Sequence, residues 1–295
     1  MILNVSGRTD IIAFYEKWFM NRLNAGFVDV RNPFNPNLVS RINFSDVDLI
    51  LFCTKNPIPI LNDLDKIKIP FIFHVTITPY KNDIEPNVIL KTEIINAVKK
   101  ISTIIGKDNI YIRYDPIFLS DKYNIVYHIK AFNKLCTLLK GYVNTIIVSF
   151  LDEYKNVLKN KNILKYRQFT ENEYKLIGEN FSNIARTNNM VVQTCFEDRN
   201  LTEYGFKKGE CLSHELAYKL TGKTYKSWKA RKERKCECVE MVDIGCYNSC
   251  KHFCKYCYAN YDEKMVNENF KNHDVNSSLL CGNLKKDDII KVRNK

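Results

Sequence analysis

The sequence contains no long hydrophobic run. None of its apolar stretches approaches the roughly 18 residues that a membrane-spanning helix needs, and the first residues do not resemble a secretory signal peptide. No internal repeat and no low-complexity segment interrupts the chain. These absences exclude a membrane span and predict a cytoplasmic protein. The 295 residues, 45% of them hydrophobic, are enough for one sizeable core or for one domain with a small appendage.

Cysteine, in contrast, is abundant. The chain has eleven cysteines, and eight of them lie between Cys195 and Cys257. Because disulfides are rare in the cytoplasm, we interpret most of this group as metal ligands. We interpret Cys53, Cys136 and Cys246 as small apolar residues. Cys281, near the C-terminus, has no evident partner in the sequence.

Three of these cysteines form a compact group. Cys250, Cys254 and Cys257 are separated by three and by two residues. Thiolates are soft ligands, and a short irregular loop can direct all three at one 4Fe-4S cluster, which leaves one iron without a protein ligand. The alternative is a structural zinc site, although such sites usually take paired Cys-x2-Cys spacings and four protein ligands.

A second set of cysteines precedes this triad. Its members are Cys195, Cys211, Cys236 and Cys238. Four thiols can hold a second, fully ligated 4Fe-4S cluster, or equally a zinc ion with four thiolate ligands. Isolated core cysteines are the remaining alternative.

Before the cysteines, short apolar runs alternate with segments of helical period. This pattern predicts an α/β fold with a partial or near-complete parallel (β/α) barrel of six to eight strands. The expected strands are residues 2–5, 27–30, 49–53, 71–77, 110–114, 145–149 and 190–194. Asp10 is expected to cap a helix, Gly106 to end another, and Thr170 with Glu173 to form a capping box. We expect residues 1–194 to form the barrel and residues 195–295 to form a cysteine-rich tail over its mouth.

Polar residues follow each expected strand. In a parallel barrel all these strand ends open onto one face, and a scaffold without a site gains nothing from desolvating them together. An ion-pair role is the alternative for any single one, such as Arg113. The candidate catalytic residues are Arg8, Asp10, Lys55, Arg113 and Asp115. The candidate cofactor-binding residues are Ser6, Thr76, Thr78, Tyr258 and Asn260.

The triad also carries a family resemblance. The order Cys-x3-Cys-x2-Cys, with Tyr256 before the third cysteine and Tyr258-Ala259 after it, resembles the radical S-adenosylmethionine (SAM) superfamily, most closely its photoproduct-lyase-like members. The wider run over residues 236–260 is similar to the domain-of-unknown-function family DUF1848, and this resemblance covers essentially the whole chain.

The resemblance implies a cofactor and a reaction. It implies a 4Fe-4S cluster whose open iron is chelated by SAM, reductive formation of a 5'-deoxyadenosyl radical, and an electron donor of the flavodoxin or ferredoxin type. The chain departs from the superfamily in two respects. The triad normally follows the first barrel strand, whereas here it lies near the C-terminus, and no Gly-Gly-Glu stretch follows any strand.

The substrate is open at this level. A formal net charge of +12 is compatible with a polyanion-binding surface or with a lysine-rich composition alone. Basic residues between Lys223 and Lys235 surround Tyr225 and Trp228, which suits either a nucleic acid contact or a solvated linker. Two hypotheses follow: a radical SAM enzyme acting on a small molecule or a nucleic acid, and a non-catalytic iron-sulfur or zinc protein whose tail holds the barrel shut.

Overall fold

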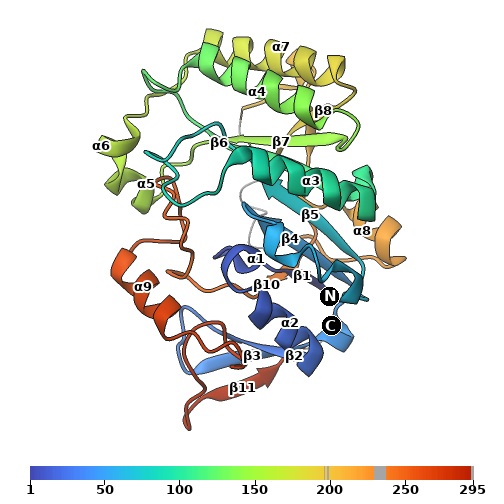
Figure 1. Cartoon of the computed structure of the whole chain (residues 1–295), viewed down its shortest axis with the longest axis vertical. Coiled ribbons are helices and arrows are strands. Elements are labelled where there is room, and N and C mark those ends of the chain that lie inside the picture. Colours follow the sequence, from blue (N-terminus) through green and yellow to red (C-terminus); the bar gives the residue numbers. More distant parts are fainter. Residues whose placement is uncertain (196, 198, 229–236, 294–295) are drawn as a thin grey trace.

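The computed structural model describes residues 1–195, 197, 199–228 and 237–293. These residues form an α/β fold with one parallel sheet of eight strands and a separate sheet of three (Figure 1). The α/β class predicted from the sequence is therefore confirmed. In the described residues, no helix is both long and apolar enough to cross a membrane.

The large sheet has the order β10-β1-β4-β5-β6-β7-β8-β9, with every neighbouring pair parallel. Its strands are β1 (Ile2–Asn4), β4 (Leu49–Thr54), β5 (Phe71–Thr76), β6 (Ile110–Ile117), β7 (Thr145–Phe150), β8 (Val191–Cys195), β9 (Lys207–Gly209) and β10 (Met241–Asp243). The sequence predicted the first six of these. It missed β9 and β10, which have only three residues each. The pairings among the described residues do not join β9 to β10, so they do not close the sheet into a barrel.

The pairing of β10 with β1 decides where the triad lies. Ile2 pairs with Met241, and Asn4 pairs with Asp243. Because parallel strands end at the same edge of a sheet, the loop after β10 emerges beside the loop after β1. The triad therefore reaches the first strand's loop although the two are more than two hundred residues apart in sequence.

The small sheet corrects one expectation. Its strands are β2 (Phe27–Arg31), β3 (Leu38–Asn43) and β11 (Ile289–Val292), with β2 antiparallel and β11 parallel to β3. We expected residues 27–30 to form a strand of the barrel. The strand exists, but its place in the parallel sheet was wrong, because a loop of only six residues turns the chain back into an antiparallel pair.

The helices begin and end largely where the sequence indicates. They are α1 (Ile11–Phe14), α2 (Glu16–Ala25), α3 (Lys91–Ile105), α4 (Ile125–Leu139), α5 (Lys155–Lys159), α6 (Lys161–Leu164), α7 (Glu171–Thr187), α8 (His214–Thr221) and α9 (Glu263–Lys271). Asp10 caps α1 by accepting a hydrogen bond from the Ala13 N–H, Gly106 follows α3 with φ of 82°, and Thr170 with Glu173 forms the capping box of α7. These three caps are confirmed.

The large sheet is buried on both faces. One core cluster joins alternate strand residues, such as Ile50 and Phe73, to α1, α2, α3, α4 and α7. The opposite face carries Leu49, Leu51 and Ile72. These side chains pack against residues that follow β9, among them Leu212 in the loop before α8 and Ala217 in α8 itself. Burial on both sides explains why these strands read as continuous apolar runs. It also shows that part of the C-terminal hundred residues covers the face of the sheet opposite α1, α2, α3, α4 and α7.

Candidate metal and cofactor site

Three cysteines of the second set meet beside strands β7 and β8. Cys195 ends β8, and its Sγ lies 2.7 Å from the Sγ of Cys211. With Cys238 these thiols all lie within 4.8 Å of one another. In a tetrahedral zinc site a Zn–S length of about 2.3 Å separates the sulfurs by about 3.8 Å. The group is therefore compact enough for a single metal ion, although the Cys195 and Cys211 sulfurs, at 2.7 Å, would have to move apart to bind one. The fourth expected member, Cys236, lies outside the described residues.

Arg113 provides positive charge beside this three-thiol group. Its Nη1 donates to Cys211 Sγ at 3.2 Å, while Nε and Nη2 donate to Asp115 at 3.0 and 2.5 Å. Hydrogen bonding by Cys195 and Cys238, together with Arg113, holds the pKa of Cys211 well below its usual range. Cys211 is therefore the thiol of this group that ionises first, which favours metal binding.

His74 of β5 lies next to the same group and was not predicted. The side chain is fully buried, and neither ring nitrogen has a hydrogen-bond partner among the described residues. Burial and the nearby Arg113 lower the pKa of His74 to about 4, so the ring is neutral at physiological pH. An unpartnered buried imidazole is costly, and it is consistent with a site that receives a further group.

The triad lies in the loop that follows β10. Cys250 and Cys254 are buried, and Cys257 is half-buried. Burial raises the pKa of all three thiols, that of Cys254 to about 12, and each thiolate of the triad would repel the others. Three uncharged thiols gathered under protein are a suitable donor set for a metal cluster, which binds them as thiolates and compensates their charge.

The backbone of this loop has an unusual conformation. Asn248 and Phe253 have φ values of 52° and 53°, a left-handed conformation that is rare for a bulky residue such as phenylalanine. Asn260 donates from Nδ2 to the Cys250 carbonyl at 2.5 Å, which joins the two ends of the loop. The loop is therefore held in a fixed shape around its three cysteines.

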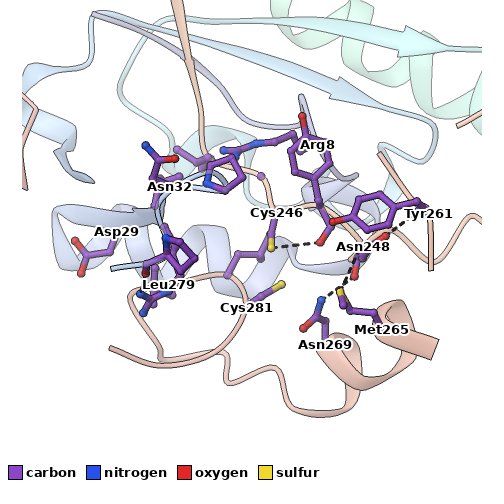
Figure 2. A pocket seen from close by; sticks show the side chains of 18 residues that line it. Arg8, Asp29, Asn32, Cys246, Asn248, Tyr261, Met265, Asn269, Leu279 and Cys281 are labelled. Atoms are coloured by element: carbon purple, nitrogen blue, oxygen red, sulfur yellow. Dashed lines mark hydrogen bonds between the residues drawn. The ribbon is translucent and has the colours of Figure 1, made fainter. Parts of the chain in front are cut away.

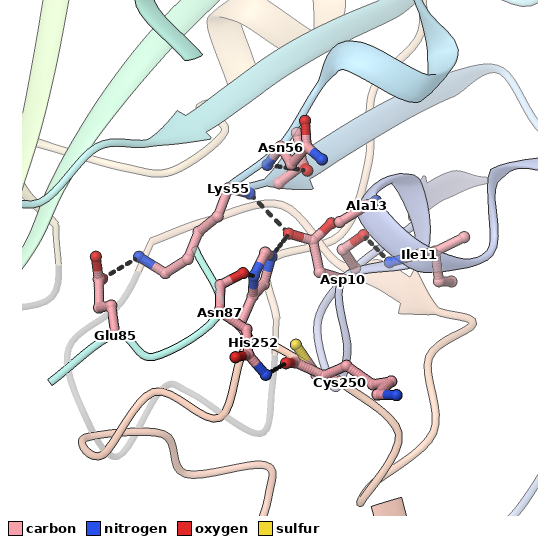
Figure 3. A network of polar contacts seen from close by, with 12 residues as sticks. Asp10, Ile11, Ala13, Lys55, Asn56, Glu85, Asn87, Cys250 and His252 are labelled. Atoms are coloured by element: carbon pink, nitrogen blue, oxygen red, sulfur yellow. Dashed lines mark hydrogen bonds and ion pairs between the residues drawn. The ribbon is translucent and has the colours of Figure 1, made fainter. Parts of the chain in front are cut away.

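Asp10 and Lys55 tie the loop to the strand ends (Figure 3). The Asp10 carboxylate accepts hydrogen bonds from the Lys55 backbone N–H at 2.7 Å and from the Ala13 N–H at 3.1 Å. The same carboxylate lies 2.9 Å from Nε2 of His252. His252 is buried, and in the sequence it stands between Cys250 and Cys254. Asp10 thus connects the ends of β1 and β4 to the triad loop.

A second buried carboxylate, Glu85, also holds the triad loop against the sheet. It accepts hydrogen bonds from Lys55 Nζ at 2.9 Å, from Thr78 Oγ1 at 2.6 Å, and from Lys91 and the Tyr256 hydroxyl. Burial alone would raise the pKa of Glu85, but the two lysines outweigh it and hold that pKa below its usual range. The charged carboxylate therefore fixes Tyr256, which lies between two cysteines of the triad.

Arg8 makes the contact between β1 and β10. Its Nε donates to Asp243 Oδ2 at 2.5 Å, and the other carboxylate oxygen of Asp243 accepts from the Gly7 N–H at 2.8 Å. The Tyr258 hydroxyl donates to the Gly7 carbonyl, and Ser6 Oγ accepts from the N–H of Ile11 at 3.1 Å. Arg8 therefore pairs with Asp243 and Arg113 with Asp115. The alternative considered for single strand-end residues, a role in an ion pair, therefore describes both arginines.

The expected site residues thus gather at one edge of the sheet in two groups. The contacts link Asp10, Lys55, Thr78, Tyr258 and Asn260 to the triad loop, while Thr76 on β5 pairs in register with Arg113 on β6. The candidate site residues did not include Asp243, His252, Glu85 and His74. The first two stand within the run that carries the resemblance, and His74 is one of the polar residues of an expected strand, but nothing in the sequence indicated Glu85.

The expectations for the basic cluster and for the cysteines outside the two groups have different outcomes. Lys223 forms an ion pair with Asp48 at 2.5 Å, and residues 229–235 of the basic cluster lie outside the described residues. Cys136 is buried in α4, as expected of an apolar residue. Cys281 does have a neighbour, the thiol of Cys246. Both of these cysteines line a pocket, so Cys246 is not simply a small core residue.

The comparison with known families supports one of the two resemblances seen in the sequence, the one to the family DUF1848. No curated protein matches the chain. One family model matches residues 2–259, which include all eleven cysteines except Cys281 and thus both cysteine groups. The chain belongs to the family described as Domain of unknown function (DUF1848).

Proposed function

We propose that this protein is an iron-sulfur enzyme of the radical SAM type, in which Cys250, Cys254 and Cys257 hold a 4Fe-4S cluster. One observation carries the proposal: the triad loop lies beside Asp10 and Lys55 at the carboxyl ends of parallel strands, where enzymes of this architecture place their sites. When bound, the cluster supplies one electron to SAM. The residues of the chain hold, orient and shield these groups.

Several residues are suited to those tasks. Burial lowers the pKa of Lys55, but Glu85 and Cys254 raise it by more, so Lys55 stays charged beside the triad. The buried Oδ1 of Asn260 has no partner among the described residues and is available to a ligand near Cys250. The core beneath the loop, including Tyr80 and Phe118, excludes water from this end of the site.

We also propose a second metal centre at Cys195, Cys211 and Cys238. The sulfur separations suit one zinc ion better than a cluster, because a cube of iron and sulfur keeps its thiolates further apart than a single ion does. The neighbouring Arg113 stabilises the thiolates, and the buried ring nitrogens of His74, which have no hydrogen-bond partner among the described residues, are available to a further ligand. Cys236 is the expected fourth ligand.

The remaining parts of the proposal concern the surroundings of the site. A closed barrel is consistent with the strand order, in which β10, a late strand in the chain, lies beside the first. A cytoplasmic location suits the free thiols, and reduction of the cluster calls for a donor of the flavodoxin or ferredoxin type. The substrate is a small molecule or a nucleic acid.

One observation favours a second candidate, a non-catalytic metal protein. Each cation expected to bind the SAM carboxylate already has a carboxylate partner: Asp243 for Arg8, Asp115 for Arg113, and Glu85 for Lys55. A purely structural role for the two cysteine groups requires no free cation. The two candidates therefore differ in whether SAM is bound and cleaved.

Anaerobic reconstitution separates them. The protein is loaded with iron and sulfide, reduced with dithionite and incubated with SAM, and 5'-deoxyadenosine is quantified. We expect one 4Fe-4S cluster that the triple alanine variant of the triad lacks, and slow SAM cleavage that this variant abolishes. Zinc without iron at the triad refutes the cluster, whereas a complete reduced cluster without any SAM cleavage establishes the non-catalytic candidate.

The arginines provide a finer test of SAM binding. Arg8→Lys and Arg113→Lys keep the charge but lose the forked donor geometry that grips a carboxylate. Loss of SAM turnover at unchanged iron content in one variant assigns the contact to that arginine. Unchanged turnover in both assigns the SAM carboxylate to another group.

A further inference from the structure

A pocket of about 250 Å³ lies between the loop after β10, the β2–β3 sheet and the tail after α9. Two thiols line it, Cys246 and Cys281, together with Arg8, Asn248 and Met265 (Figure 2). Neither thiol belongs to the triad or to the three-thiol group. Both are half-buried, so small solutes in the pocket can reach them.

The two thiols are neighbours in this pocket. The Cys246 thiol donates to the Tyr247 carbonyl at 3.4 Å, and Ser249 lies beside Cys281. In the chain the two cysteines are 35 residues apart, so their proximity results from tertiary structure. A disulfide closes only between cysteines that the fold already holds close together, and this pair meets that requirement.

Each thiol stands on a firmly held segment. Cys246 follows Gly245, whose N–H donates to Asp243 at 3.0 Å. The tail that carries Cys281 is bound to α2, where Trp18 Nε1 donates to the Ser277 carbonyl at 2.8 Å and Arg22 donates to the Asn276 carbonyl at 2.9 Å. The proximity of the two thiols is therefore built into the fold.

We propose that Cys246 and Cys281 form a redox-active dithiol, a modification site that hydroperoxides oxidise to a reversible disulfide between the loop after β10 and the tail after α9. The Cys246 thiolate attacks the peroxide oxygen and gives a sulfenic acid, with release of water or an alcohol. The Cys281 sulfur then attacks the sulfenic sulfur, forms the S–S bond and releases water. Two electrons pass from the two thiols to the peroxide, and a dithiol reductant of the thioredoxin class restores them.

The environment supports this division of roles. The neighbouring Cys281 thiol lowers the pKa of Cys246; burial opposes this effect, and the Arg8 guanidinium adds to it. Asp243, which pairs with Arg8, acts in the opposite direction but more weakly. The pKa of Cys281 is raised, mainly by its interaction with Cys246 and by burial. Cys246 is thus the attacking thiol, and Cys281 is the resolving one.

The disulfide would affect the neighbouring loop. Cys246 lies four residues before Cys250, so the bond links the entry of the triad loop to a tail that packs on α2. This inference does not rest on the proposed iron-sulfur function, because neither thiol belongs to either metal-ligand set. It holds whether the triad binds iron or zinc.

The test uses the full-length protein, reduced and purified without oxygen. It is treated with one equivalent of hydrogen peroxide, alkylated and mapped by peptide mass spectrometry. We expect a Cys246–Cys281 disulfide peptide, the loss of both residues from the alkylated pool, and their recovery after treatment with dithiothreitol. Cys136→Ser, at a buried position in α4, is the matched control and should behave as the wild type.

The Cys281→Ser variant tests the assigned roles. It should stop at a sulfenic acid on Cys246, which a dimedone probe traps, and its metal content should equal that of the wild type. The inference is overturned if both thiols remain alkylatable after peroxide treatment. It is equally overturned if Cys281→Ser or Cys246→Ser loses bound metal, because the pair would then be metal ligands.

Discussion

Glu85 is the residue whose replacement should most weaken the attachment of the triad loop. Its carboxylate is almost fully buried and binds two lysines, Lys55 and Lys91, as well as Thr78 and Tyr256. Glu85→Gln preserves the shape and can still accept hydrogen bonds, but it leaves two cations without a counter-charge. Removing one partner of a buried ion pair costs about 3–5 kcal/mol. Because the Lys91 side chain is 29% exposed, we expect the lower end, about 3 kcal/mol.

Urea unfolding of the metal-free protein measures this loss. The matched control is Glu179→Gln, which removes a carboxylate from the exposed pair with Lys175 on α7 and should change the free energy of unfolding by less than about 0.5 kcal/mol. The stabilisation by Glu85 is present above the unfolded-state pKa near 4.5 and is lost as the pH falls below it, because the folded-state pKa is depressed. A Glu85→Gln protein that unfolds within about 1 kcal/mol of the wild type would contradict the reasoning.

Three further predictions concern other residues of the site. The folded-state pKa of His74 is lowered to about 4, so wild-type stability should fall between pH 6.5 and 4, because the unfolded chain takes up a proton first. His74→Phe should remove up to about 3 kcal/mol of that pH dependence in urea unfolding curves measured at several pH values. His128, whose pKa is shifted in the same way, should retain its own contribution. Asp243→Ala should destabilise the protein by about 2–3 kcal/mol, because two backbone N–H groups and a guanidinium lose their acceptor, and Asp243→Asn should recover part of this loss in the same assay. Cys211→Ser should remove one equivalent of bound metal by elemental analysis, whereas Cys136→Ser should remove none.

Local chemistry made much of the fold predictable. The strands β4, β5, β6 and β7 are rich in apolar residues because they are buried on both faces, although His74 interrupts β5 and Arg113 interrupts β6. Such runs can be recognised without knowledge of their neighbours. The caps at Asp10, Gly106 and Thr170 depend on interactions within a few residues. The spacing of the triad likewise depends only on the loop that contains it.

Strand partners were less predictable. Residues 27–30 look like the other β-rich runs, and only the turn back into β3 places them in a separate sheet. Strands of three residues, such as β9 and β10, carry too little pattern to be recognised. Their existence depends on hydrogen bonds supplied by β8 and β1.

The sequence by itself determined the two cysteine groups, the spacing of the triad, the α/β class and the membership of the family. Only the tertiary structure decided which of these groups meet. The pairing of β10 with β1 brings the C-terminal triad to Asp10, and the packing of the last segments brings Cys246 to Cys281 and Glu85 to Tyr256. The physical reason is that each of these contacts joins residues far apart in the chain. No local propensity encodes such a contact, and only the burial of the assembled sheet selects it.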